Sequence, residues 1–159
     1  MNVDKRRFKN RGWRDMAISI RWFLRSWVQI KSQDVVIYID PAYIRTYFTG
    51  CDPIAGQPES LEKADLILVT HPHKSHCRRE TIDALRTPDT VIVAPENCAE
   101  ILGDASEAVS GFIPIKPGGH VEYEDVTVQA VPAYNTPAGH STEKLHPKGF
   151  GVGYLITIA

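Results

Sequence analysis

Short apolar runs and alternating apolar and polar positions dominate the chain, and they predict mostly strands. Residues 16–22 and 26–32 alternate apolar with polar side chains, which is the period of a half-buried strand. Residues 35–40 follow a polar break and form a nearly continuous apolar run, which is typical of a buried strand. Because these three segments follow one another with short breaks, they predict an antiparallel meander.

The remainder of the chain predicts loops, buried strands and two short helices. The Gly- and Pro-containing segments at 41–60 and 135–150 predict loops. Helix formers over 77–86 and 96–102 predict two short helices, the second of which ends before Gly103. The remaining apolar runs predict strands over 64–70, 90–94, 112–116, 120–124, 126–133 and 151–159. The fold class is therefore α/β or α+β, with a large sheet.

Composition favours a soluble protein with one core. The 159 residues are enough for one domain, and 43% hydrophobic with 23% charged residues is ordinary for a globular chain. The chain has no run of 18 apolar residues, so no membrane span is predicted. Its N-terminus has no apolar stretch typical of a signal peptide. Three cysteines without a CxxC pair argue against a disulfide framework, so we expect a cytoplasmic protein.

Positive charge is concentrated at the N-terminus. Residues 1–31 hold nine of the 18 Lys and Arg residues, against only Asp4 and Asp15. Such a segment could contact nucleic acid or a membrane surface, or it could be a solvated, partly disordered tail. No basic stripe continues past residue 31, so nucleic-acid binding is not favoured, and residues 1–15 are interpreted as a tail.

Three of the six histidines lie within six residues, in the sequence His71-Pro72-His73-Lys74-Ser75-His76. They follow the apolar run at 64–70 and precede a predicted helix, so they lie at the C-terminal end of a strand, where α/β proteins usually build sites. A turn can direct residues i and i+2 at one point, and imidazole is a common zinc ligand. The spacing predicts a metal site, with three solvated loop histidines as the alternative.

Four segments carry a resemblance to a known family. Residues 65–76 (DLILVTHPHKSH) resemble the strand and HxHxDH motif of the metallo-β-lactamase superfamily, and residues 36–41 (VIYIDP) are similar to its strand ending in Asp-Pro. Residues 131–135 (VPAYN) and 146–154 (HPKGFGVGY) resemble its lactonase-like branch, which includes ascorbate-6-phosphate lactonase-like proteins. The blocks occur in the family's order over residues 16–158. The resemblance implies an αββα sandwich.

The resemblance also implies a set of metal ligands. His71 and His73 would bind the first metal, and His146 would be its third ligand because it occupies the family's His-Pro-Lys-Gly position. His140 fits that role less well. His120 follows a Gly-Gly turn far from every motif and is interpreted as an ordinary histidine.

A second, weaker metal site would depend on fewer residues. His76 would bind the second metal, and Asp40 would help to order the site through hydrogen bonds to its ligands. The Asp of the HxHxDH motif is Ser75 here, and a neutral hydroxyl is a poor ligand for a hard dication and a poor base. The sequence thus predicts one well-formed metal site.

Two further departures concern the rest of the domain. The family's Gly-His-Ser on the first hairpin is replaced by Leu24-Arg25-Ser26. The family continues beyond the position of Ala159 with a strand, a motif that carries a metal-bridging Asp, and a later His. The resemblance therefore predicts a domain over residues 16–159 that contains the first sheet and the start of the second.

Two functions follow as hypotheses. The first is a zinc-dependent hydrolase, with Mn²⁺ or Fe²⁺ as other candidate metals, in which metal-bound hydroxide attacks an ester, lactone or phosphoester-like bond of a small molecule. The second is a non-catalytic paralogue that acts as a metal-binding or interaction domain. We expect the incomplete second sheet to favour a homo-oligomer or a complementing C-terminal fragment.

Overall fold

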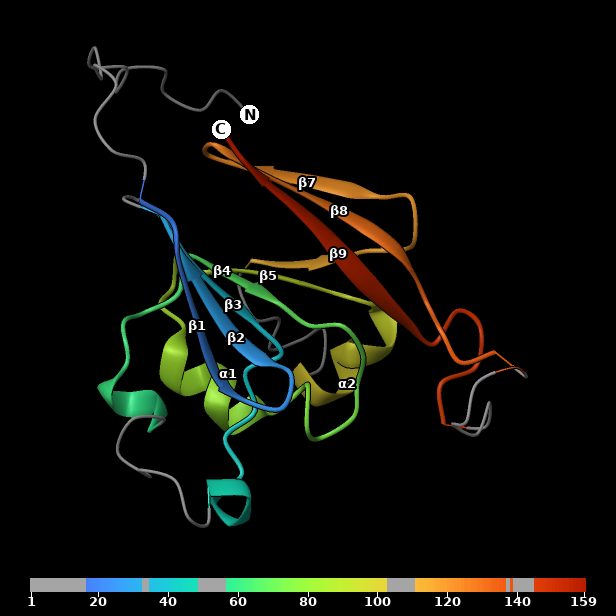
Figure 1. Ribbon diagram of the computed structural model, residues 1–159, viewed down its shortest axis with the longest axis horizontal. Coiled ribbons are helices and arrows are strands. Elements are labelled where there is room, and N and C mark those ends of the chain that lie inside the picture. Colours follow the sequence, from blue (N-terminus) through green and yellow to red (C-terminus); the bar gives the residue numbers. More distant parts are fainter. Residues whose placement is uncertain (1–16, 33–34, 49–56, 103–110, 137, 139–144) are drawn as a thin grey trace.

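The computed structural model describes residues 17–32, 35–48, 57–102, 111–136, 138 and 145–159. The predicted tail at 1–15 lies outside these residues. Six strands form a first sheet, in which spatial order follows sequence order (Figure 1). The first three strands are antiparallel and the rest are parallel. The strands are β1 (Ser19–Leu24), β2 (Trp27–Lys31), β3 (Val36–Ile39), β4 (Leu66–Leu68), β5 (Val91–Ala94) and β6 (Phe112–Pro114).

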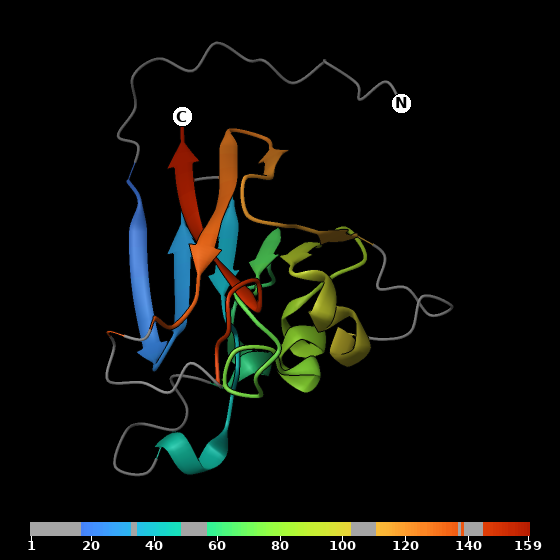
Figure 2. The same ribbon diagram turned by 90° about the vertical axis from the view of Figure 1, so that its right-hand side faces the viewer.

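A second, antiparallel sheet packs on one face of the first and consists of β7 (His120–Tyr123), β8 (Val126–Ala133) and β9 (Gly151–Ile158) (Figure 2). The helices α1 (Arg79–Leu85) and α2 (Ala99–Leu102) cover the opposite face of the first sheet. The described residues thus contain three of the four layers of the αββα sandwich that the resemblance implies. None of their helices is long and apolar enough to cross a membrane.

The structure confirms the predicted elements and adjusts their ends. The antiparallel meander is present, but β1 begins three residues later than the alternation at 16–22 indicated, and it continues to Leu24, where Arg25 turns the chain with a positive φ of 53°. In its described residues, 41–48 and 57–60, the predicted loop at 41–60 contains the 3-10 turns η1 (Arg45–Phe48) and η3 (Pro58–Ser60). The predicted helix at 96–102 begins as the 3-10 helix η4 (Glu96–Cys98).

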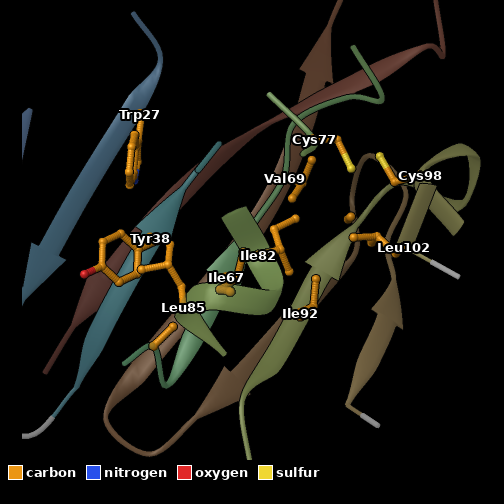
Figure 3. Packing of buried hydrophobic residues seen from close by; sticks show 12 residues of the cluster. Trp27, Tyr38, Ile67, Val69, Cys77, Ile82, Leu85, Ile92, Cys98 and Leu102 are labelled. Atoms are coloured by element: carbon orange, nitrogen blue, oxygen red, sulfur yellow. The ribbon is translucent and has the colours of Figure 1, made fainter. Parts of the chain in front are cut away.

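Two apolar cores hold the layers together. The first lies between the six-stranded sheet and the helices, and Figure 3 shows twelve of its side chains, including those of Trp27 and Tyr38. Cys77 and Cys98 are free thiols buried in this core, and their sulfur atoms face each other in Figure 3. The second core lies between the two sheets and contains Ile37 and buried side chains of β8 and β9.

The inter-sheet face of the large sheet becomes exposed toward its β1 edge. Ile20, Ile30 and Ile37 are direct cross-strand partners and therefore lie in one row on one face. Ile37 is fully buried and Ile30 half-buried, but Ile20 is 71% exposed. Trp22 lies in the next row and is 64% exposed. Within the described residues, the three-stranded sheet covers the centre of this face and leaves β1 in contact with solvent.

We expect this exposed apolar edge to cause self-association. The double variant Ile20→Lys, Trp22→Lys should lower the sedimentation coefficient at high protein concentration, because charged side chains on an edge strand oppose pairing and apolar contact. Leu155→Lys, which changes a 56% exposed side chain on β9, is the matched control. Equal association of the wild type and the double variant would exclude β1 as the contact surface.

Tyr38 links the helix-side core to a polar network. Its hydroxyl accepts a hydrogen bond from Gln29 Nε2 at 2.9 Å and donates one to the Glu62 carbonyl at 3.0 Å. Burial, followed by the charge of Glu62, raises the pKa of Tyr38 from 10.0 to about 12. The hydroxyl thus satisfies the amide of Gln29, which is itself buried.

Tyr38→Phe should lower the free energy of unfolding by about 1–3 kcal/mol, because it leaves the buried Gln29 amide without its acceptor. Urea unfolding at pH 7 measures this, and Tyr134→Phe, at a 42% exposed position, is the control. The unfolded state loses the Tyr38 proton near pH 10 and the folded state near 12, so wild-type stability should also fall across that window. A Tyr38→Phe variant with the same alkaline loss would show that another group is responsible.

Candidate metal centre

The histidine loop starts at the C-terminal end of β4 and folds back on itself. His71 lies three residues after the end of the buried strand and is only 8% exposed. The backbone N–H groups of His76 and Cys77 both donate to the His73 carbonyl at 2.8 Å, which closes a tight turn. This turn places the ring of His76 against that of His71, with 3.9 Å between their centroids. The local sequence thus gathers three imidazoles at one sheet edge.

The start of β9 brings the second sheet to the same point. Val152 N–H donates to the Thr70 carbonyl at 2.9 Å. A Cβ at Gly151 would lie 2.9 Å from that carbonyl oxygen and 3.0 Å from Cβ of His71, so a larger residue would displace the strand. The loop before β9 carries His146, which the close approach places beside His71.

His71, His73 and His146 form one cluster. Each offers a nitrogen atom, and these atoms lie within 4.8 Å of one another. Nε2 of His71 and Nε2 of His146 are 3.3 Å apart. Two nitrogens bound to one tetrahedral zinc at 2.0–2.1 Å would be separated by about 3.3 Å. The donor set and its spacing therefore fit a metal bound by three imidazoles.

The environment favours the neutral forms of His71 and His73. Burial, followed by the neighbouring His76, His146 and His73, lowers the pKa of His71 from 6.5 to about 3. Burial and the same kind of neighbours also lower the pKa of His73. At neutral pH the His71 ring therefore keeps one nitrogen lone pair free, which metal binding requires.

One aromatic side chain lines the cluster. The ring centroid of Phe150 lies 5.1 Å from that of His73 and 5.9 Å from those of His71 and His146. Asn97 Nδ2 donates to the Phe150 carbonyl at 2.9 Å and so ties this loop to η4. Phe150 thus forms an apolar wall on one side of the three histidines.

Asp40 contacts the histidine loop from the end of the adjacent strand. It is 2% exposed, adopts a positive φ of 46° and follows β3, the strand next to β4. Its carboxylate accepts the Thr70 backbone N–H at 2.7 Å and contacts Nδ1 of His76 at 2.7 Å. His76 thus pairs with Asp40 through Nδ1 and is not one of the three residues whose nitrogen atoms converge, although its ring lies against that of His71. The ordering role of Asp40 stays a prediction, and these contacts are the ones through which it would act.

The other predicted positions lie apart from the cluster or cannot be placed. His120 is exposed on β7 and is not part of it. His140 lies outside the described residues. Ser75 lies in the histidine turn. Its carbonyl accepts a hydrogen bond, 3.4 Å long, from the hydroxyl of Ser26, which lies in the β1–β2 hairpin. The hairpin that replaces the family's Gly-His-Ser thus contacts the loop through Ser26.

Two contacts of the site were not predicted from the sequence. The Thr70 hydroxyl lies 2.9 Å from Nδ1 of His71. Nδ2 of Asn135 lies 3.2 Å from Nδ1 of His146, and the Asn135 backbone N–H donates to the His146 carbonyl. The sequence did contain a signal that could have identified Thr70 as a site residue. It is a polar residue at the end of a predicted apolar strand, directly before a histidine. No spacing rule links Asn135 to His146, because the loop between β8 and β9 brings them together.

The amino-acid sequence of this chain is similar to those of a known protein family. Residues 19–159 match the family described as the β-lactamase superfamily domain. The chain belongs to this family. The match covers all the described strands and confirms the resemblance drawn from the histidine motif, together with the α/β fold class.

Individual relatives agree with the family. A UPF0173 metal-dependent hydrolase of Thermoplasma acidophilum is 36% identical over 115 residues, which cover 72% of this chain and 46% of the relative. One of Oenococcus oeni is 29% identical over 89% of this chain and 59% of the relative. A crystal structure from Parabacteroides distasonis, described as a metal-dependent hydrolase, has a TM-score of 0.71 at 29% identity and covers 89% of this chain and 56% of the other. The chain spans about half the length of the curated relatives it matches.

Ser75→Asp should create a second, weaker zinc-binding step. A carboxylate at this position would lie in the turn that carries His76, and carboxylate with imidazole is a common zinc donor pair. Calorimetric titration of the metal-free variant with zinc measures the step. Ser60→Asp, an exposed position in η3, is the matched control. If the Ser75 and Ser60 variants both titrate like the wild type, position 75 does not face a metal site.

Proposed function

We propose that this chain carries the metal-binding part of a metal-dependent hydrolase, with zinc bound by His71, His73 and His146. The observation that carries the proposal is the convergence of the three imidazoles, with His71 and His146 Nε2 atoms 3.3 Å apart. The relatives described above, which are named metal-dependent hydrolases, support it.

The donor set favours some metals over others. Three imidazoles without a carboxylate suit zinc, and they also suit iron, whereas manganese prefers oxygen ligands. Zinc held by His71, His73 and His146 would supply an activated water, because zinc lowers the pKa of a bound water to about 7. We therefore propose zinc first, Fe²⁺ second and Mn²⁺ third.

The surrounding residues would prepare the site. Asp40 holds the histidine loop through Thr70 and His76, so the ligands need little rearrangement. Phe150 shields one side of the cluster from water, which strengthens electrostatic interactions there. His76 is proposed as the ligand of a second, weaker site, which lacks the carboxylate that Ser75 replaces.

The proposed substrate is a small molecule with an ester, lactone or phosphoester-like bond, because an activated water attacks an electrophilic carbon or phosphorus. Since the chain spans about half of its relatives, the substrate-binding surface is proposed to need further polypeptide, from a second copy or a complementing C-terminal fragment. The exposed inter-sheet face at Ile20 and Trp22 supports such a partner.

A second candidate function is metal binding without turnover. The observation that favours it is the neutral Ser75 in place of the motif's Asp. A hydroxyl neither binds a hard dication well nor accepts a proton readily, so water activation would be weaker. The chain would then act as a metal-binding or interaction domain.

We expect about one zinc per chain after reconstitution of the purified protein. Elemental analysis after dialysis measures the content, and the double variant His71→Ala, His73→Ala should lose it because two of three ligands are gone. His120→Ala changes an exposed histidine on β7 and is the matched control. Two tightly held metals per chain, or unchanged binding in the double variant, would contradict the proposed site.

Turnover then separates the two functions. An aryl ester, a γ-lactone and an aryl phosphodiester are suitable probes, because each releases a measurable product. Hydrolysis that disappears with a chelator and in His146→Ala supports the enzyme. One bound zinc without hydrolysis of any probe supports the non-catalytic domain.

A further inference from the structure

We propose that Thr70 is a positioning residue that presets His71 to bind metal through Nε2. Its hydroxyl would connect the buried Asp40 carboxylate to Nδ1 of His71 and fix which ring nitrogen carries the proton. The inference rests on the proposed metal site, and it assigns a role to a residue outside the metal ligands and their direct carboxylate partner.

The Thr70 hydroxyl has two kinds of neighbours. Its oxygen lies 3.0 and 2.8 Å from the two carboxylate oxygens of Asp40, and 2.9 Å from Nδ1 of His71. Nδ1 of His76 lies farther away, at 3.4 Å, and makes a shorter contact of 2.7 Å with Asp40. The hydroxyl therefore lies between one carboxylate and the His71 ring.

Counting protons decides the direction of these hydrogen bonds. A threonine hydroxyl has one proton and two lone pairs, and an ionised carboxylate only accepts. A hydrogen bond to an ionised acceptor is about twice as strong as one between neutral groups, so the hydroxyl proton points at Asp40. The Thr70 oxygen must then accept the proton of Nδ1–H of His71.

This assignment leaves Nε2 of His71 with a free lone pair. That atom is the one that lies 3.3 Å from Nε2 of His146, at the centre of the cluster. The opposite tautomer would place a proton on Nε2 and block metal binding there. Through Thr70, one buried carboxylate thus orients His71, while it orients His76 by direct contact.

The backbone holds Thr70 in place independently of its hydroxyl. Its N–H donates to Asp40 Oδ1 at 2.7 Å, and its carbonyl accepts the N–H of Val152 from β9. Both bonds remain in Thr70→Val, which keeps the shape of the side chain and removes only the relay. Thr70→Ser keeps the hydroxyl and loses a methyl group. These two variants separate the hydroxyl from the packing.

The test is nitrogen-15 NMR of the histidine rings in the metal-free protein at pH 8, with resonances assigned by a His71→Gln variant. The wild type and Thr70→Ser should show Nδ1 of His71 protonated and Nε2 unprotonated. Thr70→Val should show a shift toward protonated Nε2, which is the tautomer that free histidine favours. Zinc affinity should fall by about 10- to 100-fold in Thr70→Val, the usual effect of losing a partner behind a ligand, and recover in Thr70→Ser.

Thr127→Val, at an exposed position of β8, is the matched control and should change neither measurement. A Thr70→Val protein with the wild-type tautomer would overturn the inference, even if its melting temperature falls. Failure of the proposed function would give a different result. The wild type itself would bind no zinc, but its His71 tautomer would still depend on Thr70.

Discussion

The buried carboxylate of Asp40 is the constraint on which the rest of the site depends. The backbone N–H of Asp40 donates to the Leu68 carbonyl, so the ends of the neighbouring strands β3 and β4 are joined just before the histidine loop begins. Its side chain then accepts hydrogen bonds from Thr70 and contacts His76. A buried charge needs several such partners, because an unpaired one would cost several kcal/mol. The loop is therefore held in one arrangement.

The second sheet supplies the remaining part of the site through a few specific contacts. The Tyr154 hydroxyl of β9 donates its proton to the Val69 carbonyl at 2.7 Å and lies 3.1 Å from the Val93 carbonyl, so it joins β9 to the ends of β4 and β5. Gly151 permits the close approach of backbone to His71. Since His146 lies a few residues before this strand, its position depends on the packing of the two sheets as much as on its own loop.

Two findings motivate the proposal that this chain has a further polypeptide partner: its partial match to the β-lactamase superfamily relatives and the exposed edge of its large sheet. The chain matches its relatives over about half of their length. In the described residues, six strands face three, and the apolar rows that end at Ile20 and Trp22 reach solvent. An apolar sheet face of this kind is stabilised when another layer covers it. The two findings together are the basis for proposing a further polypeptide partner.

Local pattern predicted much of the fold. The strands and the two short helices followed from alternation and apolar runs, because the side-chain period of a strand or helix is a local property. Their ends were less accurate, as β1 shows, since a turn such as that at Arg25 depends on backbone conformation. The division of the strands into two sheets was implied by the resemblance and not by any single segment.

The sequence by itself determined the elements, the cluster of His71, His73 and His76, and the absence of a carboxylate at Ser75. Only the tertiary structure decided which nitrogen atoms converge. It brings His146 to His71 across 75 positions of sequence, pairs Nδ1 of His76 with Asp40, and places Thr70 beside Nδ1 of His71 and Asn135 beside Nδ1 of His146. The physical reason is that a hydrogen bond or a shared metal requires approach to about 3 Å, and packing of sheets, not spacing along the chain, sets such distances between remote residues.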